Sequence, residues 1–117
     1  MGHYTGGDVL LASVRIGGPG ACKVRPVVVV STDENRNLLV CPVSSSPSSD
    51  GPSVPISLED FARGGLDLFG ESYVLSAHAS TIRPADVVGK KGSLLPETLT
   101  AIRETLPAAH QKRPRRR

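Results

Sequence analysis

The sequence has few aromatic residues: only 3% of its 117 residues are Phe or Tyr, and none is Trp. A core must therefore be built from Val, Leu, Ile and Ala, and this length leaves room for one domain with a single modest core. No apolar run approaches the roughly 20 residues that cross a bilayer. The opening residues, MGHYTGGD, lack the basic and apolar regions of a signal peptide. We therefore expect a soluble, cytoplasmic protein with no membrane segment.

Residues that would bind metals or cofactors are also scarce. Cys22 and Cys41 are too few and too far apart for a disulfide framework or a Cys-x-x-Cys metal site, and we expect Cys41 to be a buried, reduced thiol in a strand. His3, His78 and His110 are isolated, and no acidic cluster accompanies them. No glycine-rich loop precedes a helix, and no G-x-S-x-G motif is present. An enzyme of this sequence would use no metal and no cofactor, and would depend on acid, base and electrostatic chemistry.

Acidic residues are absent from the end of the chain, where basic residues gather. Five of the 14 Lys and Arg lie in residues 112–117, and all 11 acids lie before residue 105, so that residues 1–111 carry a net charge of −2. We expect residues 1–110 to form one domain and residues 111–117 to be a basic, disordered tail. Such a tail either attracts RNA through counterion release or is only a solubilising extension.

Short extended runs separated by Gly- and Pro-rich turns occupy most of the chain. The predicted strands fall at residues 6–16, 25–33, 37–46, 54–58, 71–82 and 85–94. The four valines at 27–30 indicate a strand buried on both faces, and Pro55 marks an edge strand. Helical spacing occurs once, at Leu95, Leu99, Ile102 and Leu106, with Pro96 suited to the first turn. We predict a mainly β fold, a strongly bent antiparallel sheet or barrel, with a C-terminal α-helix.

The order of these segments resembles one known family. GDVLLASV, a Gly-rich loop, KVRPVVVVS, LLVCPVSSS, ESYVLSAHASTI and a terminal helix follow one another as in the MazF/PemK (Kid) family of toxin–antitoxin endoribonucleases. The resemblance covers residues 7–106. Its most specific element is Arg-Pro before an apolar strand, coupled to Pro-Val-Ser-Ser in the next strand.

The resemblance implies a fold and an activity. The expected fold is an SH3-like barrel with a C-terminal helix, assembled as a homodimer. The expected activity is that of an mRNA interferase, which cleaves single-stranded RNA at short sequences without metal or cofactor. The ribose 2′-hydroxyl makes the cut and leaves a 2′,3′-cyclic phosphate and a 5′-hydroxyl. A cognate antitoxin protein is the expected partner.

The resemblance also assigns roles to residues. Arg25, at the start of a rigid strand, would stabilise the charge that grows on the phosphate oxygens, and Ser44 would donate a neutral hydrogen bond to the same phosphate. Arg25 could instead form a surface ion pair with Asp8 or Glu71. Ser44 could be an ordinary strand-end hydroxyl, with Ser45 or Ser46 in its place if the alignment shifts by a residue.

Two further residues are candidate RNA contacts. His78 lies in a predicted strand and can exchange a proton near neutral pH, although a structural histidine is the alternative. Lys23 is a candidate phosphate contact or a solvated lysine. The first loop lacks the Glu-Gln of many members, and Ser80 stands where some have Arg. The sequence therefore does not predict the cut site.

Two other functions are compatible with this pattern. The gyrase poison CcdB shares the fold, so a gyrase-binding toxin that works through its terminal helix is one alternative. A non-catalytic barrel that binds RNA or an antitoxin is the other. The gyrase-binding alternative predicts that the function does not depend on Arg25, and an assay of RNA cleavage products separates the ribonuclease from the other functions.

Overall fold

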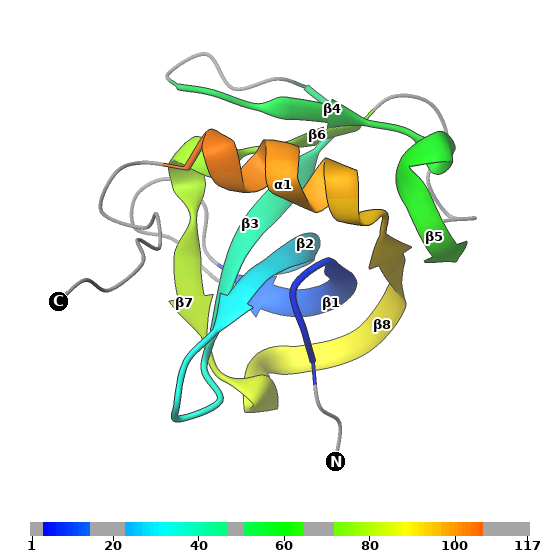
Figure 1. Ribbon diagram of the computed structural model, residues 1–117. Helices are drawn as coiled ribbons and strands as arrows, with labels where there is room; N and C mark the ends of the chain where they lie inside the picture. The colour runs from blue at the N-terminus through cyan, green and yellow to red at the C-terminus, as the bar shows by residue number, and fades with distance from the viewer. Residues whose placement is uncertain (1–3, 15–22, 47–50, 65–71, 107–117) are drawn as a thin grey trace, which may run out of the picture.

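The computed structural model describes residues 4–14, 23–46, 51–64 and 72–106. They form eight strands, three short 3-10 turns and one α-helix: β1 (Asp8–Val14), β2 (Lys23–Thr32), β3 (Leu38–Ser44), β4 (Val54–Ile56), η1 (Leu58–Asp60), β5 (Phe61–Gly64), β6 (Ser72–Val74), η2 (Ser76–His78), β7 (Ser80–Ile82), η3 (Pro84–Asp86), β8 (Val87–Leu94) and α1 (Pro96–Glu104). The strand order is β4-β6-β3-β2-β1-β8-β5, and β7 pairs with β3 outside this path. The sheet is antiparallel and strongly curled, with α1 lying across it in front of β2 and β3 (Figure 1). The prediction of a bent, mainly β fold with a C-terminal helix is confirmed.

Two hydrophobic clusters lie on opposite faces of β2. Val28 and Val30 belong to the cluster that packs against α1, and Val27 and Val29 belong to the cluster on the other face. All four valines are essentially inaccessible to solvent. Successive side chains in a strand point to opposite faces, so a run of four valines is required where both faces are covered. The predicted burial of this run is confirmed.

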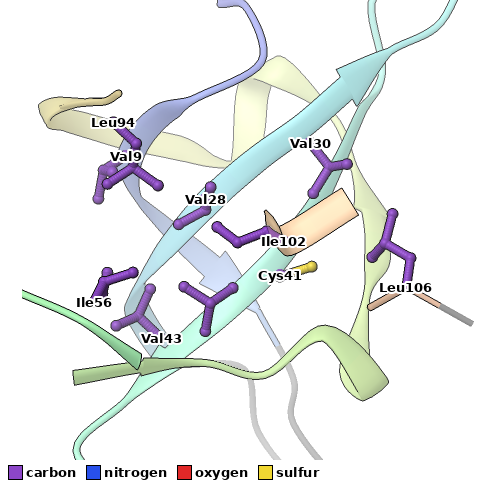
Figure 2. Close-up of a cluster of buried hydrophobic side chains, with 10 residues drawn as sticks. Val9, Val28, Val30, Cys41, Val43, Ile56, Leu94, Ile102 and Leu106 are labelled. Atoms are coloured by element: carbon purple, nitrogen blue, oxygen red, sulfur yellow. The ribbon is translucent and has the colours of Figure 1, made fainter. Parts of the chain in front are cut away.

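The terminal helix closes the first cluster. Leu99, Ile102 and Leu106 are buried as their spacing predicts, and Pro96 occupies the first helical turn. Ile102 lies between Val28 and Cys41 in Figure 2. The helix is therefore held mainly by the apolar face that it presents to the sheet.

Polar contacts fix the two ends of α1. Near its start, the Thr98 hydroxyl donates to Asp60 Oδ1 at 3.0 Å. Just beyond its end, the Thr105 and Ser76 hydroxyl oxygens are 2.7 Å apart, and the Ser76 hydroxyl donates to the Pro52 carbonyl at 3.2 Å. Ser76 is completely buried, so these bonds satisfy a polar group that would be costly to bury alone. They connect α1 to η2 and to the segment before β4.

The predicted single strand at residues 71–82 is wrong, because η2 interrupts it. Val43 lies opposite Val74, and an unbroken register would place Val40 opposite Ala77. Val40 instead lies opposite Ser80, three residues later, and η2 is three residues long. β6 and β7 thus pair with the same edge of β3 in two different registers. The periodicity of the sequence cannot reveal this change because both halves have the composition of extended segments.

The sequence analysis also missed β5, which pairs with the end of β8. Gly64 and Gly92 are opposite each other, with φ of 71° and 155°. A Cβ atom at Gly92 would lie 2.3 Å from the Arg63 carbonyl oxygen, and one at Gly64 would lie 2.2 Å from that of Lys91. Only glycine permits both the backbone conformation and this close approach. These two glycines are thus the condition for a strand pairing, although Gly92 lies inside the predicted strand at 85–94 and Gly64 lies outside the predicted strands.

Several expectations fall on residues that the structure does not describe. Cys22, Glu71 and the tail at residues 111–117 are among them, so the predicted disorder of the tail stays a prediction. In the described part of the chain, no helix is long and apolar enough to cross a membrane.

Candidate functional site

Arg25 and Ser44 lie at the point where β2 and β3 separate. The pairing of these strands is recorded up to Val27 opposite Pro42. Beyond it, β2 continues against β1, with Arg25 opposite Ala12, whereas β3 turns to β6, with Ser44 opposite Tyr73. Arg25 and Ser44 are each two residues past that last pair.

Strand alternation places both side chains on the same face of the sheet. Arg25 shares the face of Val27, and Ser44 shares that of Pro42, which is paired with Val27. This is the face opposite α1, because Val27 belongs to the second cluster. Continuing the β2–β3 register by two residues would set Arg25 opposite Ser44. The two residues that the resemblance selects as catalytic therefore lie on one face of the sheet, each two residues past the last β2–β3 pair.

Arg25 is held by a rigid strand and is half-buried. It is the third residue of β2 rather than its first, because β2 begins at Lys23 and pairs there with Val14 of β1. Backbone pairing on one side and the buried valines that follow fix its main chain. A guanidinium mounted in this way offers a planar set of donors.

Asp8 is not the partner of Arg25. Its buried carboxylate lies 3.3 Å from Lys90 Nζ and accepts a hydrogen bond from Thr5 N at 3.0 Å. Asp8 also precedes Ala12, the β1 partner of Arg25, by four residues, which corresponds to about 13 Å along a strand. The ion pair with Asp8 is thus contradicted, and the alternative with Glu71 lies outside the described residues.

The Ser44 hydroxyl is oriented by the chain that follows it. Its oxygen accepts a hydrogen bond from Ser46 N at 3.2 Å. Since an N–H donor uses a lone pair of that oxygen, the hydroxyl proton can be donated elsewhere. Ser44 is half-buried at the end of β3, whereas Ser45 and Ser46 are exposed beyond it.

The exposed Lys23 lies on the same edge as Arg25. One residue, Val24, separates it from Arg25 in β2, so both side chains belong to one face. Two cations two positions apart on one strand provide a local positive charge at the start of β2, as phosphate binding requires.

His78 lies on the other side of β3. It is the last residue of η2 rather than part of a strand, and it is half-buried. The hydrogen bond from Leu75 N to the Pro42 carbonyl, 2.8 Å, holds this turn against the β3 edge that faces away from β2. Two strand spacings, about 10 Å, therefore separate the backbones of His78 and β2. His78 does not come next to Arg25 in the way that Ser44 does.

Cys41 is excluded as a nucleophile by its surroundings. Its side chain faces α1 inside the first cluster and is completely buried. Burial raises the pKa of the Cys41 thiol to about 12, so the reactive thiolate is absent at neutral pH. The prediction of a buried, free thiol is confirmed.

The described residues contain no group of three or more His, Cys, Asp or Glu arranged to hold a metal ion. A residue that the sequence analysis did not select is Tyr73, directly opposite Ser44. Its neighbours Ser72 and Val74 are both buried. Since side chains alternate along a strand, Tyr73 must point to the other face, and this alternation is the sequence signal that could have selected it.

Comparisons with known proteins identify the family of this chain. Residues 5–110 match the family described as PemK-like, MazF-like toxin of type II toxin–antitoxin system. The fold is similar to that of the Mycobacterium tuberculosis toxin MazF-mt6, with a TM-score of 0.63 and 21% identity over 85% of this chain and 91% of that chain. A comparison with curated proteins gives no significant match. The chain belongs to the family of PemK-like, MazF-like toxins of type II toxin–antitoxin systems.

Proposed function

We propose that this toxin is an endoribonuclease that cleaves single-stranded mRNA without a metal or cofactor. The observation that carries the proposal is the position of Arg25 and Ser44 on one face, where β2 and β3 separate. A charged, planar donor and a hydroxyl with a free proton are what a phosphodiester with growing negative charge requires.

The proposed step is an internal transesterification. The ribose 2′-oxygen attacks phosphorus and loses its proton to a base. The new 2′-O–P bond forms as the bond from phosphorus to the 5′-oxygen breaks, and that oxygen takes up a proton. The products are a 2′,3′-cyclic phosphate and a 5′-hydroxyl. Arg25 binds the non-bridging oxygens through two N–H groups, and Ser44 donates to one of them.

Arg25 acts as an electrostatic group and not as the base, since an arginine side chain stays protonated. Lys23, Ser45 and Ser46 bind the RNA backbone next to the reacting phosphate, because all three are exposed near the ends of β2 and β3. His78 contacts RNA further along, on the other edge of β3.

The partners follow from the same surface. Membership of a type II family implies an antitoxin, and we propose that an acidic segment of it covers Arg25 and excludes RNA.

We further propose a cytoplasmic homodimer, in which a second copy covers apolar side chains such as Val24 and Val88, which are 55% and 64% exposed. Light scattering that gives a monomer at micromolar concentration would contradict the dimer.

Product analysis on mixed-sequence RNA tests the activity. Cleavage should continue in excess EDTA and should stop when the nucleotide that carries the attacking hydroxyl is 2′-deoxy. Arg25→Lys keeps the charge but loses the planar donors, so it should fail almost as badly as Arg25→Ala. Ser44→Ala should be milder, since the loss of one neutral donor costs about 1 to 3 kcal/mol.

Folded controls make that comparison decisive. Neither side chain belongs to a core cluster, so each variant should melt close to the unsubstituted protein. A 3′-hydroxyl product, a metal requirement or full activity in Arg25→Ala would each exclude the proposed reaction. Absence of RNA cleavage by the unsubstituted protein, together with an inhibition of gyrase that Arg25→Ala leaves intact, would favour the CcdB-like alternative.

A further inference from the structure

Tyr73 is the middle residue of β6 and is paired on both sides. It lies opposite Ser44 in β3 and opposite Pro55 in β4. Its neighbours Ser72 and Val74 are buried, and Val74 belongs to the cluster under α1. Alternation therefore directs Tyr73 to the opposite face, where it is half-buried.

Tyr73 continues the row of side chains that begins at Arg25. Across β2, β3, β6 and β4, the residues on this face are Arg25, Ser44, Tyr73 and Pro55. Directly paired residues have Cβ atoms about 5 Å apart, so the ring of Tyr73 starts about 5 Å from Ser44. A base attached to the sugar beside a phosphate at Ser44 lies within reach of that ring.

Among the described aromatic residues, Tyr73 alone belongs to neither hydrophobic cluster. Tyr4 packs against the second cluster and Phe61 against the first. In a chain with only two Tyr and two Phe, an aromatic side chain on the face of the candidate phosphate-binding residues is a specific feature. Aromatic rings on a positively charged surface are the usual platform for unpaired bases.

We infer that Tyr73 stacks on the unpaired base next to the phosphate that Arg25 and Ser44 bind. The inference rests on the proposed ribonuclease function and adds a substrate contact to it. Because every base has a flat π face, stacking contributes affinity with little dependence on sequence. Tyr73 thus selects single-stranded over paired RNA, since a paired base is not free to stack on it.

The test measures binding and cleavage separately, with full-length protein. The binding probe is a labelled single-stranded RNA that is 2′-deoxy at the cut position and cannot be cleaved. Tyr73→Leu should weaken its binding by about ten-fold, and Tyr73→Phe, which keeps the ring, should bind as the unsubstituted protein does. On cleavable RNA, Tyr73→Leu should raise KM and leave kcat nearly unchanged. Leu58→Ser, a change at an exposed apolar residue in η1, is the matched control.

The salt dependence separates stacking from phosphate binding. Tyr73→Leu should leave the slope of the logarithm of the RNA association constant against the logarithm of the salt concentration unchanged. Lys23→Gln should make that slope shallower by an amount that corresponds to about one released counterion. Equal binding by Tyr73→Leu and the unsubstituted protein would overturn the inference. Equal weakening in Tyr73→Phe and Tyr73→Leu would also overturn it, because the hydroxyl rather than the ring would then be responsible.

Photo-crosslinking covers the case in which Tyr73→Leu does not fold. RNA with 5-iodouridine beside the cut position should crosslink to Tyr73, as peptide mass spectrometry would show, and crosslinks only to other residues would overturn the inference.

The proposed function fails separately, when the unsubstituted protein does not cleave RNA or when Arg25→Ala still does. If cleavage needs Arg25 but Tyr73→Leu binds normally, only the stacking inference is lost.

Discussion

The contact between Arg103 and the Val30 carbonyl should be a measurable part of the stability of the fold. The β2–β3 register shifts between Val29 and Ser31, so that Val30 has no paired residue in β3. Arg103, in the last turn of α1, donates to the Val30 carbonyl from Nε at 3.2 Å and from Nη2 at 2.7 Å. The helix thereby satisfies a backbone group at a bulge in the central strand, 73 residues away in sequence.

The size of the effect follows from the exposure of the two partners. A hydrogen bond from a charged donor contributes about 1.5 to 3 kcal/mol, and an unsatisfied buried carbonyl costs a similar amount. Val30 is 2% exposed, but Arg103 is exposed, so water can replace part of the interaction. We expect Arg103→Leu to reduce the free energy of unfolding by about 1 to 2 kcal/mol. For a domain of this size, that lowers Tm by roughly 5 to 10 °C.

Thermal and urea denaturation of three variants would measure this loss of stability. Arg103→Lys keeps one donor and should lie between Arg103→Leu and the unsubstituted protein. Arg63→Leu, at an exposed arginine in β5, is the control for loss of an arginine and should change Tm little. The reasoning fails if Arg103→Leu melts with the unsubstituted protein, or if Arg63→Leu is equally destabilised.

Three further results are expected. In a Cys22→Ser background, the Cys41 thiol should resist alkylation at pH 8 to 9 until the protein unfolds. Because its pKa rises from 9.0 to about 12 on folding, it contributes stability that is complete below pH 9 and is lost as the pH rises toward 12; this loss should be absent in Cys41→Ala, and an equal loss in both proteins would contradict it. Removal of residues 111–117 should leave the melting curve unchanged and reduce only the salt-sensitive part of RNA affinity, so unfolding of the truncated chain would show that the tail is structural. Gly92→Ala should destabilise the domain strongly, since the new Cβ would meet the Arg63 carbonyl at 2.3 Å, whereas Gly89→Ala, where a Cβ meets nothing within 4 Å, should melt nearly as the unsubstituted protein does.

Local patterns in the sequence predict much of the framework. The valines at 27–30 and the spacing of Leu99, Ile102 and Leu106 indicate a doubly buried strand and an amphipathic helix, and both are found. Pro55 predicts an edge strand, and β4 is at one end of the sheet. These features succeed because burial and backbone geometry act within a few neighbouring residues. The family itself follows from the order of motifs around Arg25 and Ser44, which the match over residues 5–110 confirms.

Tertiary structure alone determined how those segments meet. The break at η2, the pairing of Gly64 with Gly92 and the contact from Arg103 to Val30 each depend on a partner far away in the chain. The same holds for the candidate site. Sequence similarity selected Arg25 and Ser44, but the separation of β2 from β3, and the continuation of that row to Tyr73, arise from pairing across three strands. A one-dimensional pattern records which face a side chain takes, but not which strand lies beside it, because pairing energy depends on the whole sheet.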